Sequence, residues 1–140
     1  MKLKKYHQLN IRIYFEDTDS GGIVYHSKYL NFAERARTEF LRSINLDQSI
    51  IEKKYGLIFV VKKLNILYIR SASLDDYLIV KTRILELNKA KVIFSQLIYK
   101  NKILISKLEA TVCCLNKNRK IARMNKKIYD ILNKERELYE

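Results

Sequence analysis

The sequence contains no proline and no tryptophan, and it has only three glycines, two cysteines and two histidines among 140 residues. The cysteines are Cys113 and Cys114, and neighbouring side chains in a strand point to opposite faces, which argues against a disulfide between them. No group of cysteine, histidine and acidic residues has the spacing of a metal site. We therefore expect buried free thiols and neither a metal nor a redox cofactor.

Long apolar runs are also absent, and no stretch approaches the length of a membrane span. The first five residues are basic, but they lack the apolar stretch and the small-residue cleavage site of a secretory signal. A chain of this length can build one sizeable core but not two. We therefore expect a cytoplasmic protein with a single domain over residues 1–140.

Acidic residues are few relative to basic ones, which gives a formal net charge of +13. A strongly basic domain suggests nucleic-acid binding as one function. The lysines are spread along the whole chain, however, and no helix-turn-helix, zinc-finger or aromatic–glycine RNA-binding signature is present. The shortage of proline and tryptophan beside abundant Lys, Asn and Ile also points to a general compositional bias. A basic nucleic-acid-binding domain stays open as an alternative.

One stretch, residues 15–29, holds two of the three glycines and one of the two histidines in the sequence FEDTDSGGIVYHSKY. Before it, apolar and polar residues alternate from Leu9 to Glu16, which predicts a half-buried strand. After it, apolar residues recur at spacings of three and four, which predicts an amphipathic helix from about Val24 to Ser43. The acidic residues therefore lie on a loop that leads into a helix N-terminus, where unpaired backbone N–H groups carry partial positive charge.

Such a loop offers a particular chemistry. A helix N-terminus can polarise a carbonyl oxygen, and a nearby carboxylate can act as a general base or a nucleophile. Together they suit acyl transfer from an activated carbonyl. Asp, Ser and Gly before a helix are also common in simple turns and caps, so the spacing alone leaves both interpretations open.

The remainder of the chain changes to a strand pattern after Gly56. We predict strands over residues 57–69, bent near Lys62-Lys63, and over 78–85, 92–99 and 104–114, with Leu104 and Leu108 on the same face. Asn101-Lys102 has the position of a two-residue hairpin turn, and Asn125 is a candidate cap for a helix near the C-terminus. Short turns imply antiparallel neighbours, so we expect an α+β fold.

The run from Tyr14 to His26, with Tyr29 and the segment 34–39 (ERARTE), resembles the hot-dog-fold acyl-CoA thioesterases. The subgroup is that of 4-hydroxybenzoyl-CoA thioesterase and the YbgC-type, Tol-Pal-associated enzymes. The resemblance extends from about residue 9 to about residue 131 and is strong in the first third. It implies a hot-dog fold, in which an antiparallel five-stranded sheet wraps around one long central helix, here followed by a C-terminal helix.

The resemblance also implies the reaction and the partners. The substrate would be an acyl-CoA or an acyl-carrier-protein thioester, cleaved to a free acid and a thiol, with coenzyme A present only as part of the substrate. The anionic phosphates of coenzyme A would be attracted by the basic residues. Hot-dog domains pair their sheets edge to edge, so a homodimer or homotetramer is expected. Peripheral association with the membrane or with lipid-synthesis proteins is a further expectation.

Asp19 occupies the catalytic carboxylate position of the family, and the alternative for it is an Asx turn that satisfies loop amides. In the family the backbone N–H at the position of His26 polarises the thioester oxygen, which leaves its imidazole as a group that lines the pocket or positions water. Asp17 lies beside the catalytic acid and is expected to brace the loop. The residues expected to contact substrate are Gly21, Gly22, Tyr25 and Tyr29, although aromatic residues at helix spacing are more often core.

Some hot-dog thioesterases carry the catalytic acid on the helix instead. Glu34 and Glu39 are the candidates for that role here, but their charged neighbours favour a solvated face. His7 lies outside the motif and is expected to be structural. An acyl-thioester dehydratase is a third alternative, which lacks support because the His-containing signature of that branch is not found.

Overall fold

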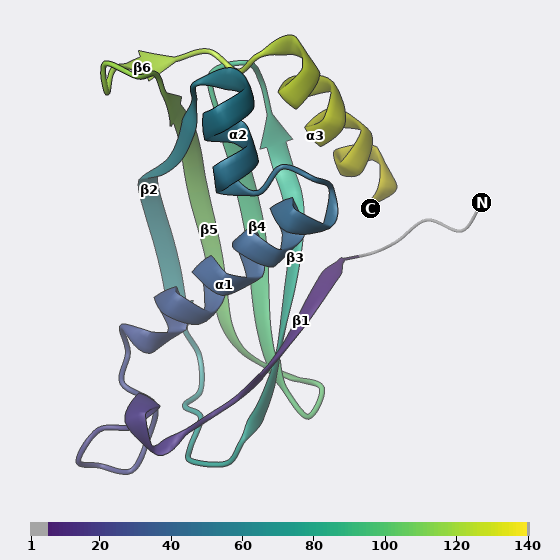
Figure 1. The fold of residues 1–140 in the computed structure, drawn as a ribbon. Helices are drawn as coiled ribbons and strands as arrows, with labels where there is room; N and C mark the ends of the chain where they lie inside the picture. Colours follow the sequence, from purple (N-terminus) through teal and green to yellow (C-terminus); the bar gives the residue numbers. More distant parts are fainter. Residues whose placement is uncertain (1–5, 140) are drawn as a thin grey trace.

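A computed structural model describes residues 6–139 of the chain as one antiparallel sheet packed against helices (Figure 1). The strands are β1 (His7–Arg12), β2 (Ile58–Tyr68), β3 (Tyr77–Leu87), β4 (Val92–Lys100), β5 (Ile103–Leu115) and β6 (Ile121–Ala122). The helices are α1 (Lys28–Ser43), α2 (Gln48–Tyr55) and α3 (Lys126–Leu138), with a 3-10 turn, η1 (Phe15–Asp17), between β1 and α1. The mixed α+β architecture predicted from the sequence is confirmed.

The five long strands have the spatial order β1-β3-β4-β5-β2, and the two-residue strand β6 pairs with β5 beside them. All pairs are antiparallel. The β4–β5 connection is the predicted Asn101-Lys102 turn, and both residues have positive φ angles, 49° and 68°. This is the backbone that a two-residue hairpin requires, and here it forms without glycine. The pairing of β2 with β5 shifts register between Val61 and Lys63, at the predicted bend.

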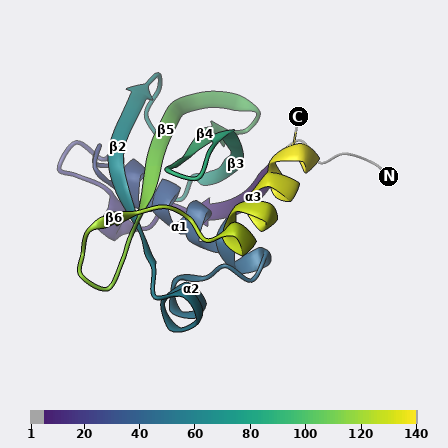
Figure 2. The same cartoon turned by 90° about the horizontal axis from the view of Figure 1, so that it is seen from above.

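Helix α1 lies on the concave side of the sheet, which curves around it (Figure 2). Its predicted apolar stripe is buried, with Phe32, Ala33, Ala36 and Phe40 all at 0% exposure. The small side chains of the two alanines allow the helix to lie close to the strands. Helix α3 begins as predicted, since the Asn125 side chain accepts a hydrogen bond from the backbone N–H of Lys127 at 2.7 Å. Cys113 and Cys114 are both buried free thiols, and burial raises the pKa of Cys114 to about 11.

Two predicted boundaries around the motif are wrong. The alternation predicts that Phe15 is a buried residue of the first strand. In the structure β1 ends at Arg12, and Phe15 is 79% exposed. The reason is that the backbone N–H of Asp17 bonds to the Tyr14 carbonyl and turns the chain into η1. The predicted helix start near Val24 is also early. The N–H of Val24 donates to Ala72 at 2.8 Å, so the chain at this point belongs to the loop and α1 begins at Lys28.

Two side chains also differ from the sequence prediction. Leu104 is only partly buried and Ile105 takes its place in the core, because an irregularity opposite Tyr99 shifts the register of β5. Arg37, one of the charged neighbours of Glu34 and Glu39 that favoured a solvated face, is buried and donates to the side-chain oxygen of Gln96 at 2.9 Å.

Candidate active site

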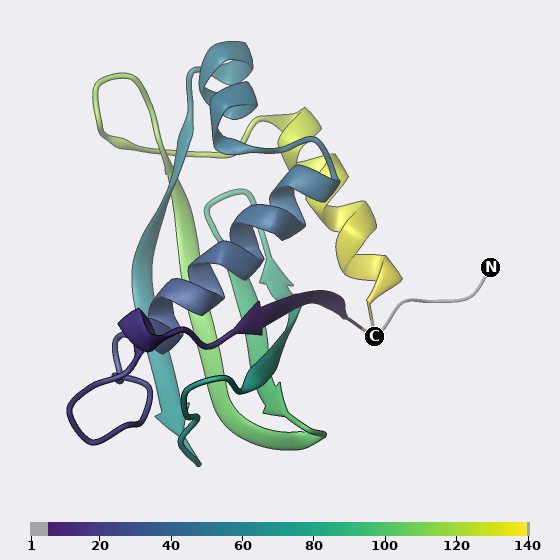
Figure 3. The ribbon, with the colours of Figure 1, turned by 60° about the horizontal axis from the view of Figure 1, so that its bottom comes forward.

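The loop between β1 and α1 projects beyond the end of the helix (Figure 3). Its own backbone holds it closed. The N–H of Asp19 donates to Ile23 at 2.9 Å, and the N–H of Gly22 donates back to Asp19 at 3.0 Å. The N–H of Tyr25 donates to the Asp17 carbonyl at 2.9 Å, so both ends of the loop are joined. These bonds present residues 19–22 at the tip.

Asp19 lies at this tip with an exposed side chain. One carboxylate oxygen, Oδ1, accepts a hydrogen bond from the N–H of Gly21 at 2.8 Å, which is the Asx turn that the simpler interpretation of the sequence describes. A Cβ atom added at Gly21 would lie 3.2 Å from that oxygen, and Gly22 has a φ angle of 81°. The two glycines therefore fit a turn in which the carboxylate is held close to the backbone while Oδ2 stays free of protein donors in the described part of the chain.

Asp17 is the buried acid of the loop, with 5% of its surface exposed. Its Oδ2 atom accepts a hydrogen bond from the N–H of Tyr14 at 2.9 Å. Its carbonyl oxygen accepts from Tyr25, as described above. The side-chain carboxylate and the backbone carbonyl of Asp17 therefore both hold the loop together. Because the residue is buried, its carboxylate is poorly accessible to a substrate.

His26 lies two residues before the first residue of α1. Its imidazole is exposed and packs against the Tyr25 ring, with centroids 4.5 Å apart. Among residues 6–139, the His26 N–H makes no hydrogen bond. Its carbonyl oxygen accepts a hydrogen bond from the Tyr68 hydroxyl at 2.9 Å. An unpaired backbone donor therefore lies one residue before Ser27, the N-cap of α1.

A cavity of about 270 Å³ opens beside His26, and we call it the aromatic cavity. Its lining residues come from the loop, α1 and the end of β2: Ile23, Val24, His26, Tyr29, Tyr68, Ile69, Arg70 and Ser71. Tyr29 is buried in its wall, and its hydroxyl oxygen accepts a hydrogen bond from the N–H of Ala72 at 3.0 Å. Burial raises the pKa of Tyr29 and of Tyr68, so both hydroxyls keep their protons at neutral pH. The lining of this cavity is mostly apolar.

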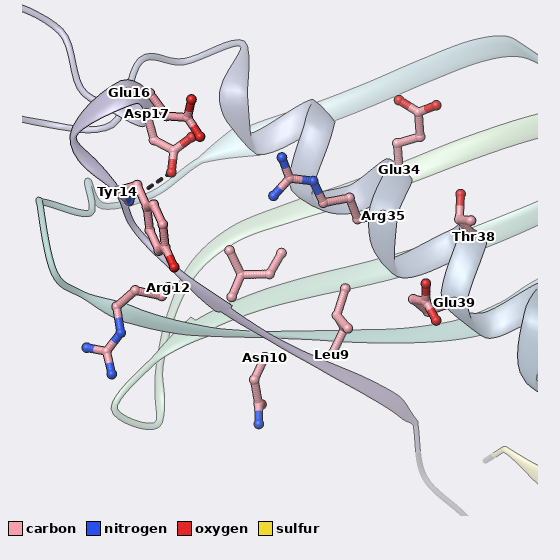
Figure 4. A pocket seen from close by; sticks show the side chains of 11 residues that line it. Leu9, Asn10, Arg12, Tyr14, Glu16, Asp17, Glu34, Arg35, Thr38 and Glu39 are labelled. Atoms are coloured by element: carbon pink, nitrogen blue, oxygen red, sulfur yellow. Dashed lines mark hydrogen bonds between the residues drawn. The ribbon is translucent and has the colours of Figure 1, made fainter.

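A larger cavity of about 670 Å³ lies between β1 and α1, and we call it the charged cavity. Figure 4 shows side chains from the strand and from the helix facing it on opposite sides. It is lined by Leu9, Asn10, Ile11, Arg12, Tyr14, Glu16, Asp17, Glu34, Arg35, Thr38 and Glu39. Glu34 is exposed as expected, whereas Glu39 is only partly exposed and forms an ion pair with Arg42. Both helix carboxylates therefore border a cavity and not only open solvent.

The predicted site residues are thus divided between these places. His26 and Tyr29 line the aromatic cavity, Asp17 lines the charged cavity, and Asp19, Gly21, Gly22 and Tyr25 are exposed on the loop. Sequence reasoning missed Tyr68, Arg70 and Ser71, the first of which lies 42 positions after His26. They share only their position at the end of a strand, and this is not a specific signal. Within residues 6–139, no group of three or more His, Cys, Asp or Glu could hold a metal ion, and no helix is long and apolar enough to cross a membrane.

Comparison with known proteins adds independent findings. Residues 21–106 match the model of the thioesterase superfamily. The chain is 45% identical over 106 residues to the acyl-CoA thioesterase YbgC of Haemophilus influenzae, covering 76% of this chain and 78% of that protein. It is 37% identical over 107 residues to the acyl-CoA thioester hydrolase YbgC of Escherichia coli O6:H1, covering 76% and 79%. The crystal structure of a probable thioesterase from Bartonella henselae superposes with a TM-score of 0.82 at 32% identity, covering 86% and 99%.

Proposed function

The chain belongs to the thioesterase superfamily and has the hot-dog fold, and we propose how it hydrolyses acyl-CoA thioesters: Asp19 supplies the carboxylate, and the backbone N–H of His26 polarises the carbonyl. The observation that carries the activity is the similarity to the YbgC thioesterases over three quarters of the chain. This similarity favours a hydrolase over the nucleic-acid-binding and dehydratase alternatives.

In the proposed reaction, the thioester oxygen accepts a hydrogen bond from the His26 N–H. The unpaired amide and the positive end of α1 stabilise the negative charge that develops on this oxygen. Asp19 either takes a proton from an attacking water or attacks the carbonyl carbon itself. The C–S bond then breaks. In the first route the proton held by Asp19 passes to the leaving sulfur, which gives the free acid and the thiol of the carrier. In the second route the sulfur leaves as a thiolate that takes a proton from water, and an acyl–aspartate anhydride remains. Water then hydrolyses this anhydride, which releases the free acid and restores the carboxylate.

The loop geometry supports this assignment. Only Oδ1 of Asp19 is engaged by the loop, through Gly21, and Oδ2 has no protein donor in the described part of the chain. Gly21 and Gly22 lack side chains, so the substrate can closely approach the backbone of the loop tip. In the same proposal the acyl group enters the aromatic cavity along Tyr29, while Tyr25 borders its entrance. The high positive charge favours either anionic carrier, coenzyme A or acyl carrier protein.

A thiol-detecting assay over a panel of acyl-CoAs and acyl-carrier-protein thioesters tests the activity and identifies the substrate class. We expect release of the free thiol without any added metal. Absence of turnover on every thioester, together with nucleic-acid binding that survives physiological salt, would instead support the alternative function, because purely electrostatic binding weakens steeply with salt.

We also propose that the protein forms a homodimer or homotetramer in the cytoplasm. Among residues 6–139, strand β2 pairs with β5 on one side and with no strand on the other, where the Gln48 side chain bonds to the backbone of Phe59. A free edge of this kind is a template for pairing with another strand. Sedimentation at micromolar concentration should give at least a dimer, and a stable monomer would contradict this proposal.

A further inference from the structure

Tyr68, the last residue of β2, connects the edge of the sheet to the start of α1. Its hydroxyl donates to the carbonyl oxygen of His26 at 2.9 Å, although the two residues are 42 positions apart. Its ring makes edge-on contacts with the rings of His26 and Tyr29, with centroid distances of 6.4 and 5.6 Å. The side chain is nevertheless 43% exposed, so burial in the core does not account for its position.

We propose that Tyr68 is a positioning residue for the thioesterase reaction, holding the chain at His26 so that the backbone N–H of His26 points at the substrate carbonyl. This inference rests on the proposed function, in which that N–H stabilises the oxyanion. It assigns a role to a residue outside the sequence motif.

The hydrogen bonds around His26 explain why such a residue is needed. In a regular helix the His26 carbonyl would accept from the N–H of Leu30, four residues later. Here the N–H of Leu30 donates to the Ser27 carbonyl instead, at 3.1 Å. The helix therefore does not fix the His26 carbonyl, and the Tyr68 hydroxyl provides the donor that the helix does not.

The peptide on the other side of His26 is fixed separately. The Tyr25 carbonyl, which shares its peptide plane with the His26 N–H, accepts a hydrogen bond from Lys28 at 2.9 Å. With Tyr68 holding the following peptide, both planes that flank the His26 Cα atom are restrained. The direction of the N–H is then fixed before the substrate binds, and such preorganisation is what makes a donor effective toward an oxyanion.

Tyr68 is itself attached to a rigid part of the sheet. The Ser106 hydroxyl of β5 donates to the Leu67 carbonyl at 3.0 Å, and the N–H of Ile69 donates to Ile105 at 2.9 Å. Hydrogen bonds on both sides of Tyr68, one from the Ser106 side chain and one within the backbone, therefore hold the strand end against β5. The hydroxyl also remains a donor at neutral pH, because partial desolvation raises the pKa of Tyr68 above its usual value.

The test replaces Tyr68 by Phe, which removes the hydroxyl and keeps the ring. We expect kcat on the preferred acyl-CoA to fall about three- to tenfold, the effect of one hydrogen bond, while KM changes less than about twofold. The matched control is Tyr77→Phe, because Tyr77 has a similar exposure of 46% and its hydroxyl makes no hydrogen bond among the described residues. This control should retain the wild-type kcat.

A second readout follows the backbone directly. The amide signals of His26 and Ser27 in a ¹H–¹⁵N spectrum should shift in Tyr68→Phe and remain in place in Tyr77→Phe. Tyr68→Leu removes the ring contacts as well and should lower kcat further than Tyr68→Phe.

Equal kcat values for Tyr68→Phe and Tyr77→Phe would overturn the inference, as would a loss of thermal stability in Tyr68→Phe with kcat unchanged. A wild-type kcat in Tyr68→Leu would overturn it too. Failure of the proposed function gives a different result, since the wild-type protein would then cleave no thioester, or Asp19→Asn would remain active.

Discussion

The aromatic cavity and the charged cavity both reach α1, but they differ in size and in the state of their polar groups. The charged cavity is more than twice as large, yet its buried acid Asp17 is bonded to Tyr14 and its Glu39 is paired with Arg42. The small aromatic cavity has beside it an unpaired N–H at a helix N-terminus. In the proposed mechanism, cavity volume therefore does not mark the reactive place in this protein. The unpaired backbone N–H marks it instead, because a preorganised N–H can stabilise charge that develops on a substrate, whereas Glu34 in the charged cavity is an exposed carboxylate.

The largest effect is expected at Asp19, which lies on the loop that supplies Ile23 and His26 to the aromatic cavity. Replacing Asp19 by Asn keeps the size of the side chain but removes its ability to take a proton at neutral pH or to attack effectively. We expect turnover to fall about 10²–10⁴-fold if it is a general base, and further if it is the nucleophile, with the fold retained. Steady-state kinetics and thermal unfolding measure both quantities.

Asp17→Asn serves as the matched control for this experiment. It should lower turnover much less and should cost about 1 kcal/mol of stability, because the buried carboxylate accepts the Tyr14 N–H. If Asp17→Asn is inactive and Asp19→Asn is not, the roles of the two loop acids are reversed.

His26→Ala should give an intermediate effect. It removes the imidazole and its contacts with Tyr25 and Tyr68 but keeps the backbone donor. Complete loss of an oxyanion donor costs about 10²–10³ in kcat, so we expect a smaller decrease than that. A decrease as large as that of Asp19→Asn would mean that the imidazole itself takes part in the chemistry.

Asp76 fixes the turn at Ser73, two residues after Ser71 of the aromatic cavity. Burial alone would raise the pKa of Asp76, but hydrogen bonds from Lys100 and from the Ser73 N–H outweigh it and hold the pKa below its usual value. The stability that this carboxylate contributes is therefore present above its unfolded-state pKa of about 3.9 and is lost as the pH falls through the lower folded-state value.

Asp76→Asn should accordingly destabilise the protein at pH 7, by about 1 kcal/mol or less. The difference from wild type should shrink as the pH falls below the unfolded-state pKa and disappear below the folded-state pKa, where the wild-type carboxyl is protonated in both states. Urea unfolding at several pH values measures this. A difference that is independent of pH would show that the carboxylate charge is not the stabilising feature.

The smallest effect is expected in the charged cavity. Glu34 is exposed and makes no ion pair among residues 6–139, so Glu34→Gln should change kcat/KM by less than about twofold. An inactive Glu34→Gln enzyme would reverse the comparison and place the catalytic acid on the helix, as in other hot-dog thioesterases.

Local patterns in the sequence determined most of the fold. The alternation of strand residues, the apolar stripe of α1, the Asn101-Lys102 turn and the Asn125 cap each depend on neighbours within a few positions, and each is present in the structure. The motif between residues 14 and 39 likewise indicated the family, which the comparisons confirm.

Tertiary structure alone decided how the site is closed. The start of α1 moved to Lys28 because Val24 bonds to Ala72, and Arg37 became buried because Gln96 accepts its hydrogen bond. Tyr68 reached His26 from 42 residues away. No local pattern encodes such contacts, because they depend on which strand end the fold brings to the N-terminus of the helix, and that is fixed only when the sheet curves around α1.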